Sequence, residues 1–479
     1  MFTIEFSLKL KVSRKTQARK RPKKNICSQK SKKRSRPAKI IIFSWFSSLL
    51  VPPPRALSLI MDWLLTRQTD PLGHTTSYTY DPFGHVRTTL DPRGIQTTNI
   101  YSQDGHFNLL SSQVGSLPAS SYSYDGNGNL IVETSPGGIV THSTYDPASG
   151  FMTSQKVGSL ETDYTNDANG NRTKEIKLNP SSPSGQNLVT TRYQYDGGNR
   201  LVETDYADST YTQTVYDALG HMVSTLDQKG RNTLNFYDAQ GRAVSIQYPD
   251  GRSVTYGYDN EGHRTVQTEF GSGGAGFHKT TTDYDAFGRP VTVTYPDLSS
   301  TSTQYDAQGR AVTVTDENGN RTANTYDQAG RRTATIVGLG ISQQETDYGY
   351  DQDGNVTTTT VGMRLQSTNT YDDANRVTRV DYPDGNFTQT SYDGDGRKTS
   401  FKDQAGKTTG FAYDSQGRLV LVMDALGQTT SYSYDEVGNE IGQTDANTPA
   451  HTTHYTYDAM NRRISRILPD GTIETYGVV

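Results

Sequence analysis

The chain has 479 residues with 47 Lys and Arg against 51 Asp and Glu, and only 32% of its residues are hydrophobic. This content, with a mean hydropathy of −0.73, is too low for one large solid core. The only cysteine is Cys27, so an intrachain disulfide is excluded, which argues against a Cys-rich animal receptor and favours a bacterial protein.

Residues 1–60 differ from the rest in charge, and we predict that they form an N-terminal tail that is disordered or not native to the protein. They contain 16 Lys and Arg and one acidic residue, whereas residues 61–479 contain 31 basic and 50 acidic residues. The apolar stretch from Ile40 to Val51 is too short for a membrane span, which needs about 20 residues. Secretion or anchoring and nucleic-acid binding are the alternatives for this tail. The acidic body has no electrostatic footprint for nucleic acid.

From Asp70 onward the sequence repeats with a period of 21 residues, which indicates a repeat architecture. Eighteen tyrosines mark the period, 11 of their 17 spacings are 21 residues, and all but two of them are followed by Asp. Two longer gaps carry Asn179–Gln186 and Gly271–Gly276, which we predict to be insertions at turns. The 18 tyrosines are Tyr80, Tyr101, Tyr124, Tyr145, Tyr164, Tyr195, Tyr216, Tyr237, Tyr258, Tyr284, Tyr305, Tyr326, Tyr350, Tyr371, Tyr392, Tyr413, Tyr434 and Tyr457.

Each repeat predicts two short strands and two turns. Asp at the first position and Gly at the fourth, as in Asp238–Gly241 and Asp306–Gly309, are typical of a type I turn. After the turn, β-branched residues alternate with others, as in Ala311–Val314, which a half-buried strand requires. Tyrosine pairs such as Tyr193 and Tyr195 lie on one strand face, where we expect them to stack across strands.

The predicted fold is therefore all-β, made of repetitive antiparallel β-hairpins over residues 61–479. The period implies about 36 strands and a sheet on the order of 170 Å long. A twisted sheet of that length must coil, stack or close, so we expect a long curved sheet, a shell or a barrel wall. The sequence ends where another Tyr-Asp is due, so we expect the repeat segment to be C-terminally incomplete, the interior of a longer protein.

The recurring Tyr-Asp-x-x-Gly-Arg motif, as in Tyr305–Arg310, resembles the RHS/YD-repeat family over about Asp70 to Gly477. That resemblance implies that the repeats spiral into a large hollow β-shell. Family members include the shells of bacterial polymorphic and insecticidal toxin complexes, which enclose a toxic C-terminal segment, and the extracellular barrels of teneurins. The resemblance therefore implies a shell or surface role.

Four positions of the motif are our candidate structural anchors of the repeat. Its Arg residues have two interpretations: a ladder that pairs with neighbouring Asp or stacks on Tyr, or a binding surface for a glycan or cargo. Four histidines, His74, His85, His221 and His263, follow a turn Gly where Arg or Asn often sits, so we interpret them as variants of that position rather than ligands. The selected anchors are Tyr195, Asp196, Tyr216, Asp217, Tyr237, Asp238, Gly241, Arg242, Tyr305, Asp306, Gly309, Arg310, Tyr413, Asp414, Gly417 and Arg418.

No catalytic motif accompanies the repeat. The sequence contains no H-E-x-x-H, G-x-S-x-G, G-x-x-x-x-G-K-[ST] or C-x-x-C. Acidic turns such as Asp316–Asn320 resemble half a calcium loop but lack the Gly and Glu that complete an EF-hand, so we interpret them as structural turns, with weak surface calcium as the alternative. We predict no enzymatic activity, no cofactor and no metal.

The predicted function is structural: a segment of a shell that encloses and helps deliver a toxic C-terminal cargo, of the bacterial-competition or insecticidal kind. Its partners would be the rest of a longer RHS protein or that cargo, with no nucleic acid and no transmembrane span. The predicted location is secreted or on the bacterial cell surface. The alternative is a cell-surface adhesion or glycan-binding YD-repeat module that binds carbohydrate or a receptor through exposed tyrosines.

Overall fold

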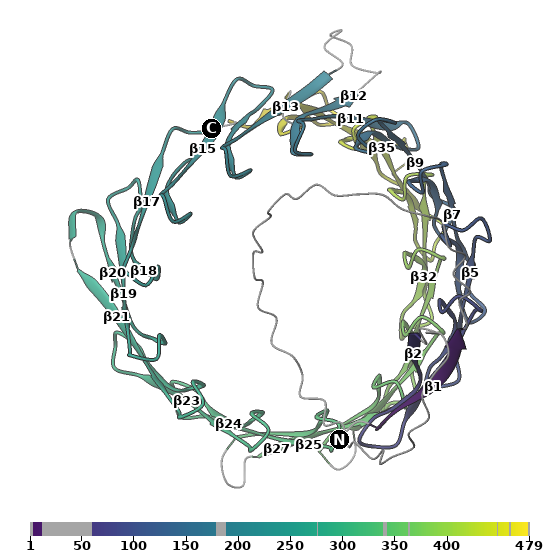
Figure 1. Cartoon of the computed structure of the whole chain (residues 1–479), viewed down its shortest axis with the longest axis horizontal. Helices are drawn as coiled ribbons and strands as arrows, with labels where there is room; N and C mark the ends of the chain where they lie inside the picture. Colours follow the sequence, from purple (N-terminus) through teal and green to yellow (C-terminus); the bar gives the residue numbers. More distant parts are fainter. Residues whose placement is uncertain are drawn as a thin grey trace, which may run out of the picture.

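The chain folds into one continuous antiparallel sheet that bends into a ring (Figure 1). The computed structural model describes residues 3–11, 60–178, 188–274, 276–338, 343–362, 365–447, 449–458 and 461–477. These residues form 39 strands and a short 3-10 turn, with no α-helix among them. Each strand pairs with the strands before and after it in the sequence, so the sheet is a ribbon of consecutive hairpins. The predicted all-β curved sheet is confirmed.

The strands have the following bounds. The first third comprises β1 (Thr3–Lys11), β2 (Ile60–Thr69), β3 (Thr75–Tyr80), β4 (Val86–Leu90), β5 (Gln96–Tyr101), β6 (Leu109–Val114), β7 (Ser120–Tyr124), β8 (Leu130–Thr134), β9 (Val140–Tyr145), β10 (Met152–Val157), β11 (Leu160–Asn166), β12 (Arg172–Leu178) and β13 (Leu188–Tyr195). The middle comprises β14 (Leu201–Asp205), β15 (Tyr211–Tyr216), β16 (Met222–Leu226), β17 (Asn232–Tyr237), β18 (Ala243–Gln247), β19 (Ser253–Tyr258), β20 (Arg264–Phe270), η1 (Ser272–Gly274), β21 (Phe277–Tyr284), β22 (Pro290–Thr294), β23 (Ser300–Tyr305), β24 (Ala311–Thr315), β25 (Arg321–Tyr326) and β26 (Arg332–Val337). The last third comprises β27 (Gln344–Tyr350), β28 (Val356–Val361), β29 (Leu365–Tyr371), β30 (Val377–Asp381), β31 (Phe387–Tyr392), β32 (Lys398–Lys402), β33 (Thr408–Tyr413), β34 (Leu419–Met423), β35 (Thr429–Tyr434), β36 (Glu440–Thr444), β37 (Thr452–Tyr457), β38 (Arg463–Ile467) and β39 (Ile473–Thr475).

The turn that follows each anchor tyrosine, here called the YD turn, closes in the same way throughout. In the turn Asp306–Gly309, the Gly309 N–H donates to the Asp306 carbonyl at 3.0 Å, and Gly309 has a φ of 86°. The Asp306 carboxylate accepts the backbone N–H groups of Gln308 and Arg310, both at 2.9 Å. This is a type I turn ending in a left-handed Gly, which bulges the ladder at Tyr305.

The other turn of each repeat, here called the return turn, uses the same closure on the opposite edge of the ribbon. In Asp316–Gly319 the Gly319 N–H donates to the Asp316 carbonyl at 3.0 Å, with a φ of 79° at Gly319. Because consecutive hairpins alternate, all YD turns line one edge of the ribbon and all return turns line the other. The ribbon therefore has two edges of similar shape.

The ribbon is a thin wall rather than the outside of a packed core. Val254 and Ala334 are the only buried hydrophobic side chains among the described residues, and none of those residues has a side chain that is fully buried. Figure 1 shows that no labelled strand crosses the centre of the ring, and that β32 and β35 return along the arc already occupied by β5, β7 and β9. The sheet thus passes its own start as a spiral of more than one turn.

The N-terminal segment and the two insertions fall at the margins of the described structure. Strand β1 pairs with β2, while residues 12–59, most of the predicted tail, lie outside the described residues. The whole insertion Asn179–Gln186 also lies outside them. The insertion Gly271–Gly276 holds η1 between β20 and β21, at the return-turn edge, as expected of an inserted turn. The domain boundary at residue 60 stays a prediction.

Candidate functional site: the Arg–Tyr ladder and the seam between turns

Most of the Arg residues in YD turns join their own repeat to the next one. Arg310 donates from Nε to Asp306 Oδ2 at 2.6 Å and from Nη1 to the backbone carbonyl of Asp327 at 3.0 Å. Its guanidinium also lies 4.8 Å from the centroid of the Tyr326 ring. One side chain therefore makes a charge-assisted pair, a turn-to-turn hydrogen bond and a cation–π contact. Arg242, Arg289, Arg331, Arg376 and Arg418 repeat this set.

The anchor tyrosine fixes the other side of the same contact. Tyr305 Oη donates to the backbone carbonyl of Pro290 at 2.8 Å, under the guanidinium of Arg289. Tyr326 does the same with the carbonyl of Ala311, also at 2.8 Å. Each tyrosine ring thus reaches from the end of its own strand to the start of the preceding strand.

The predicted anchor residues all occupy this ladder. The hydroxyls of Tyr195, Tyr216, Tyr237, Tyr305 and Tyr413 donate to backbone carbonyls at 2.9, 3.4, 2.8, 2.8 and 2.9 Å. Asp196, Asp238, Asp306 and Asp414 accept the Arg of their own turn, whereas Asp217 pairs with His221. Gly241, Gly309 and Gly417 have positive φ values, and Arg242, Arg310 and Arg418 lie over the next anchor tyrosine. That these residues stabilise the wall is a proposal tested in the Discussion.

Histidine replaces Arg at some turns without breaking the ladder. His221 Nδ1 lies 2.8 Å from Asp217 Oδ2, and its ring stacks on Tyr237 with centroids 4.8 Å apart. His263 makes the same contacts with Asp259 and Tyr284. The anchor tyrosines of these repeats therefore stack on Arg or His, and the expected stacking of tyrosine on tyrosine is not what fixes them. The flat guanidinium or imidazole above each ring takes that place.

One of the 18 tyrosines that mark the period, Tyr164, does not occupy an anchor position. The residue that precedes the turn Asp167–Gly170 is Asn166, where the ladder bulges, and not Tyr164. Asn166 Nδ2 donates to the Met152 carbonyl at 3.1 Å, as the other anchors do through their hydroxyls. Tyr164 belongs to the second tyrosine position, two residues earlier, and packs under Arg172 at 3.7 Å. The short spacing of 19 residues from Tyr145 is the sequence signal that could have found this.

Where the spiral overlaps itself, two edges of the ribbon meet along a line that we call the seam. The edge with the YD turns belongs to the later turn of the spiral, and the edge with the return turns belongs to the earlier turn of the spiral. Arg93 donates from Nε to Asp353 Oδ2 at 2.6 Å. The Ser116 backbone N–H and hydroxyl both donate to Asp373 Oδ2 at 2.8 Å. Further contacts are Arg93 Nη2 to the Asp372 carbonyl at 3.2 Å, Gly137 N–H to Asp395 Oδ1 at 2.7 Å, Gln416 Nε2 to Ser159 Oγ at 2.9 Å, and Arg462 Nη2 to Asp208 Oδ2 at 3.0 Å.

Close approach at the seam depends on glycines. A Cβ atom added to Gly394 would lie 2.3 Å from the backbone oxygen of Pro136, and one added to Gly137 would lie 2.2 Å from the Asp395 carboxylate. The same position of a YD turn outside the seam, Gly197, has no atom within 4 Å. The small residues therefore let the two edges interlock where they meet.

The pKa values of the carboxylates in the wall are lowered at some positions and raised at others. Hydrogen bonds from the backbone and hydroxyl of Ser116 hold the pKa of Asp373 below its usual value, which favours the charged form at the seam. Burial raises the pKa of Asp81, but hydrogen bonds from the His85 side chain and from the backbone outweigh it and bring the pKa down to about 2. Asp91 differs, because burial and the nearby carboxylate of Asp353 raise its pKa despite a backbone hydrogen bond from Ile95.

No group of three or more His, Cys, Asp and Glu side chains in the described part of the chain is arranged to hold a metal ion. None of its helical segments is long and apolar enough to span a membrane. What recurs instead is one structural unit.

Comparison with known proteins identifies that unit. The RHS repeat family matches the sequence at residues 64–96, 237–273, 305–342, 392–423 and 413–450. This chain is an RHS-repeat protein. The suspected family is therefore confirmed. No curated protein matches the sequence.

Two solved structures share the fold of this RHS-repeat chain. One is a mutant Tc holotoxin pore of Photorhabdus luminescens, with a TM-score of 0.61 and 14% identity over 85% of this chain. The other is a TcdB2-TccC3-TEV protein, with a TM-score of 0.57 and 14% identity over 88% of this chain. The RHS-repeat chain spans 25% and 27% of the lengths of those two chains. It thus has the architecture of about a quarter of each.

Proposed function

We propose that this RHS-repeat chain is a segment of a shell wall that encloses a polypeptide cargo within a longer bacterial protein. The observation that carries the proposal is the seam. A ribbon whose successive turns interlock through Arg93, Ser116, Gly137 and their partners makes a continuous barrier, whereas an open ribbon would not. Containment asks only for such a barrier and for no reacting group.

The nature of the cargo extends this proposal. The family resemblance and the Tc toxin relatives of the same fold support a toxic C-terminal segment as the cargo, and secretion or cell-surface display as the location. The partner in this proposal is the remainder of the same RHS protein or its cargo. In it the wall acts by separating that segment from its surroundings until delivery.

The test uses the full chain fused at its C-terminus to an unfolded, protease-sensitive reporter. We expect electron microscopy to show a ring with an open centre, and limited proteolysis to cleave the reporter more slowly than the same reporter fused to an unrelated globular protein. Solution scattering from the unfused chain gives an independent measure of hollowness. A solid particle, or a reporter cleaved at the control rate, would reject containment.

A second candidate function, adhesion through exposed side chains, is favoured by the turn tips. Phe287 is 83% exposed and Leu219 81% exposed, both at the third position of a YD turn on the free edge. Exposed apolar side chains at turn tips are the contacts that an adhesion surface would use. Binding of the full chain to immobilised glycans or bacterial cells, lost on Phe287→Ala, would support adhesion. Unchanged binding in that variant would count against it.

A further inference from the structure

Among the described residues, the repeat between the YD turns at Asp146 and Asp167 replaces both members of the Arg–Tyr pair. The position that carries Arg, His or Asn in other turns carries Phe151, and the anchor position carries Asn166 instead of Tyr. Both members of the usual stacked pair are therefore replaced in the same repeat. The consequence is a change in both shape and charge.

The two replacements occupy the places of the groups that they replace. A Cβ atom added to Gly170 would lie 3.0 Å from the Phe151 ring, just as one added to Gly241 would lie 2.7 Å from His221. The Asn166 amide bonds the Met152 carbonyl, which is the equivalent of the carbonyl that accepts the hydroxyl of the other anchors. Asn is shorter than Tyr, so the space normally filled by a phenol ring is left open beneath Phe151.

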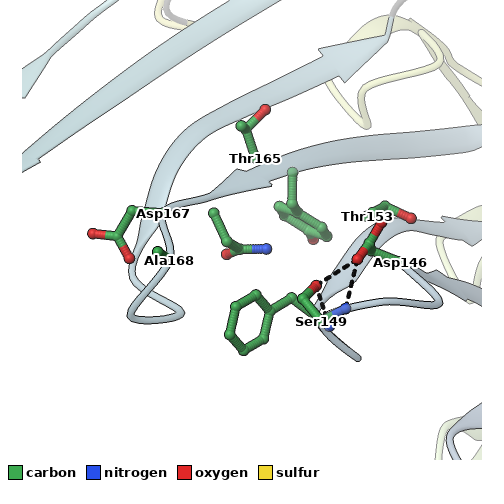
Figure 2. Close-up of a pocket in the computed structure, with 9 residues that line it drawn as sticks. Asp146, Ser149, Thr153, Thr165, Asp167 and Ala168 are labelled. Atoms are coloured by element: carbon green, nitrogen blue, oxygen red, sulfur yellow. Dashed lines mark hydrogen bonds between the residues drawn. The ribbon is translucent and has the colours of Figure 1, made fainter.

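A cavity of about 570 Å³ lies at this break. Its lining includes Phe151, Tyr164, Asn166, Asp146 and Asp167. Figure 2 shows Asp146 bonded to Ser149 on one side and Asp167 on the other side of the space. A volume in this range is typical of sites that take small organic groups.

The electrostatics of the cavity also differ from the ladder. In other turns the second carboxylate oxygen of Asp accepts the Arg, His or Asn of its own turn, as in Asp306 with Arg310. In the Asp146 turn, Ser149 and Ala148 bond only Oδ1, and no residue of the described structure donates to Oδ2. An acceptor is therefore left facing the space, next to an aromatic ring.

The cavity is accessible because it lies on the free edge of the ribbon. The seam uses the return turns of the earlier spiral turn, such as Gly137 and Ser159, whereas the cavity lies between two YD turns on the opposite edge. No contact that joins the two spiral turns in the described part of the chain involves a residue lining it. An incoming group therefore displaces nothing from the wall.

We propose that this cavity is a binding pocket for one phenol-bearing aromatic side chain, a tyrosine presented by an extended polypeptide. A bound phenol would take the place that the anchor Tyr takes in the other repeats, with its ring against Phe151 and its hydroxyl toward the Met152 carbonyl or the Asp146 carboxylate. Aromatic rings prefer such offset or tilted contacts, and a buried hydroxyl needs an acceptor. The repeat that lacks its own anchor tyrosine therefore binds a tyrosine side chain from another polypeptide segment.

The test measures binding of N-acetyltyrosinamide to the full chain by saturation-transfer NMR, with N-acetylphenylalaninamide and a monosaccharide as comparison probes. We expect saturable binding of the tyrosine probe, weaker binding of the phenylalanine probe and none of the sugar. The variant Asn166→Tyr restores the repeat and fills the space, so it should abolish binding. The variant Phe151→Ala removes one ring contact and should weaken binding about threefold to tenfold.

A matched control separates the pocket from a general effect of an added tyrosine. Asn318→Tyr places the same substitution on an exposed return turn and should leave binding unchanged. Melting curves show whether each variant is folded, and Asn166→Tyr should melt no lower than the parent protein. Binding that survives Asn166→Tyr would overturn the proposal, and so would the absence of saturable binding to the parent chain. Preferential binding of the sugar would overturn it too and assign the cavity to a carbohydrate instead.

Discussion

The guanidinium of Arg310 lies over the ring of Tyr326 in the next repeat, with its central carbon 4.8 Å from the ring centroid. Because Arg310 is also paired with Asp306 and bonded to the Asp327 carbonyl, each repeat reaches forward and holds the turn after it. Stability in such an array is a sum over neighbouring repeats. The wall therefore depends on many equal links rather than on a central core.

The first prediction concerns that link. Arg310→Ala should lower the free energy of unfolding by about 1–2 kcal/mol, because it removes a charge-assisted pair and a cation–π contact on a side chain that is mostly covered. Arg310→His should cost less, since His occupies this position at His221 and His263. Urea unfolding followed by circular dichroism measures both. Arg252→Ala, on an exposed return turn, is the control and should change little; equal effects at both sites would refute the ladder.

The second prediction concerns the anchor ring. A fully buried aromatic side chain loses roughly 3–5 kcal/mol when cut to Ala. Tyr305 is only partly buried, so Tyr305→Ala should cost about 2 kcal/mol, and Tyr305→Phe about 0.5–1 kcal/mol for the bond to Pro290. Thermal unfolding compares them with Tyr211→Ala, a tyrosine that is 46% exposed and outside the anchor position. A melting curve of Tyr305→Ala that overlays the parent curve would show that the ring does not contribute to the stability of the fold.

The third prediction concerns the seam. Gly394→Ala should push the later turn away from Pro136, because the added methyl group has no space, and should cost about 1–3 kcal/mol. Gly197→Ala is the matched control, since it is the same position of a YD turn with nothing within 4 Å. Hydrogen exchange reports directly, because the Gly137 amide donates to Asp395. Faster exchange at Gly137 in Gly394→Ala only is expected, whereas unchanged protection would mean that the two edges do not meet in solution.

The fourth prediction concerns acid. The backbone N–H of Arg310 and then its side chain hold the pKa of Asp306 below its usual value, and the pKa of Asp81 falls to about 2. A carboxylate with a lowered folded-state pKa stabilises the fold fully above its unfolded value, about 3.9, and loses that contribution as pH falls through its folded value. Denaturation midpoints should therefore stay level from pH 7 to about 5 and fall between about pH 4 and 2. A midpoint that declines already between pH 7 and 5 would contradict this assignment.

Local chemistry makes much of the fold predictable. Asp and Gly at fixed positions specify the turns, and alternation specifies strands such as β24, so the amino-acid pattern alone is enough to place the repeats. Asn166 was missed because the pattern was traced through tyrosine, whereas the ladder position is defined by the bulge and the following Asp. The Arg residues were predicted to pair with Asp or stack on Tyr, and they do both.

The seam could not be predicted in the same way. Its contacts join residues such as Ser116 and Asp373, which are 257 positions apart. Every repeat offers similar turns, so the period leaves open which earlier turn a later one will meet. That choice follows from the curvature of the ribbon, which accumulates from small twists between strands and has no local sequence signal. The cavity beside Phe151 was missed for a related reason, because its lining residues come together only after folding.

Most of the seam contacts join residues 254 to 260 positions apart, which is about twelve repeats, and the contact between Arg93 and Asp372 spans 279 positions. One turn of the spiral therefore contains a nearly constant number of repeats. Gain or loss of one whole repeat would shift every later YD turn by one return turn along the seam, where it would meet an edge of the same shape. Insertion of part of a repeat within a strand would shift every later YD turn so that it faces the gap between two return turns of the earlier spiral turn. Such a wall can lengthen during evolution only in complete units, with odd residues confined to loops such as Ser272–Gly274.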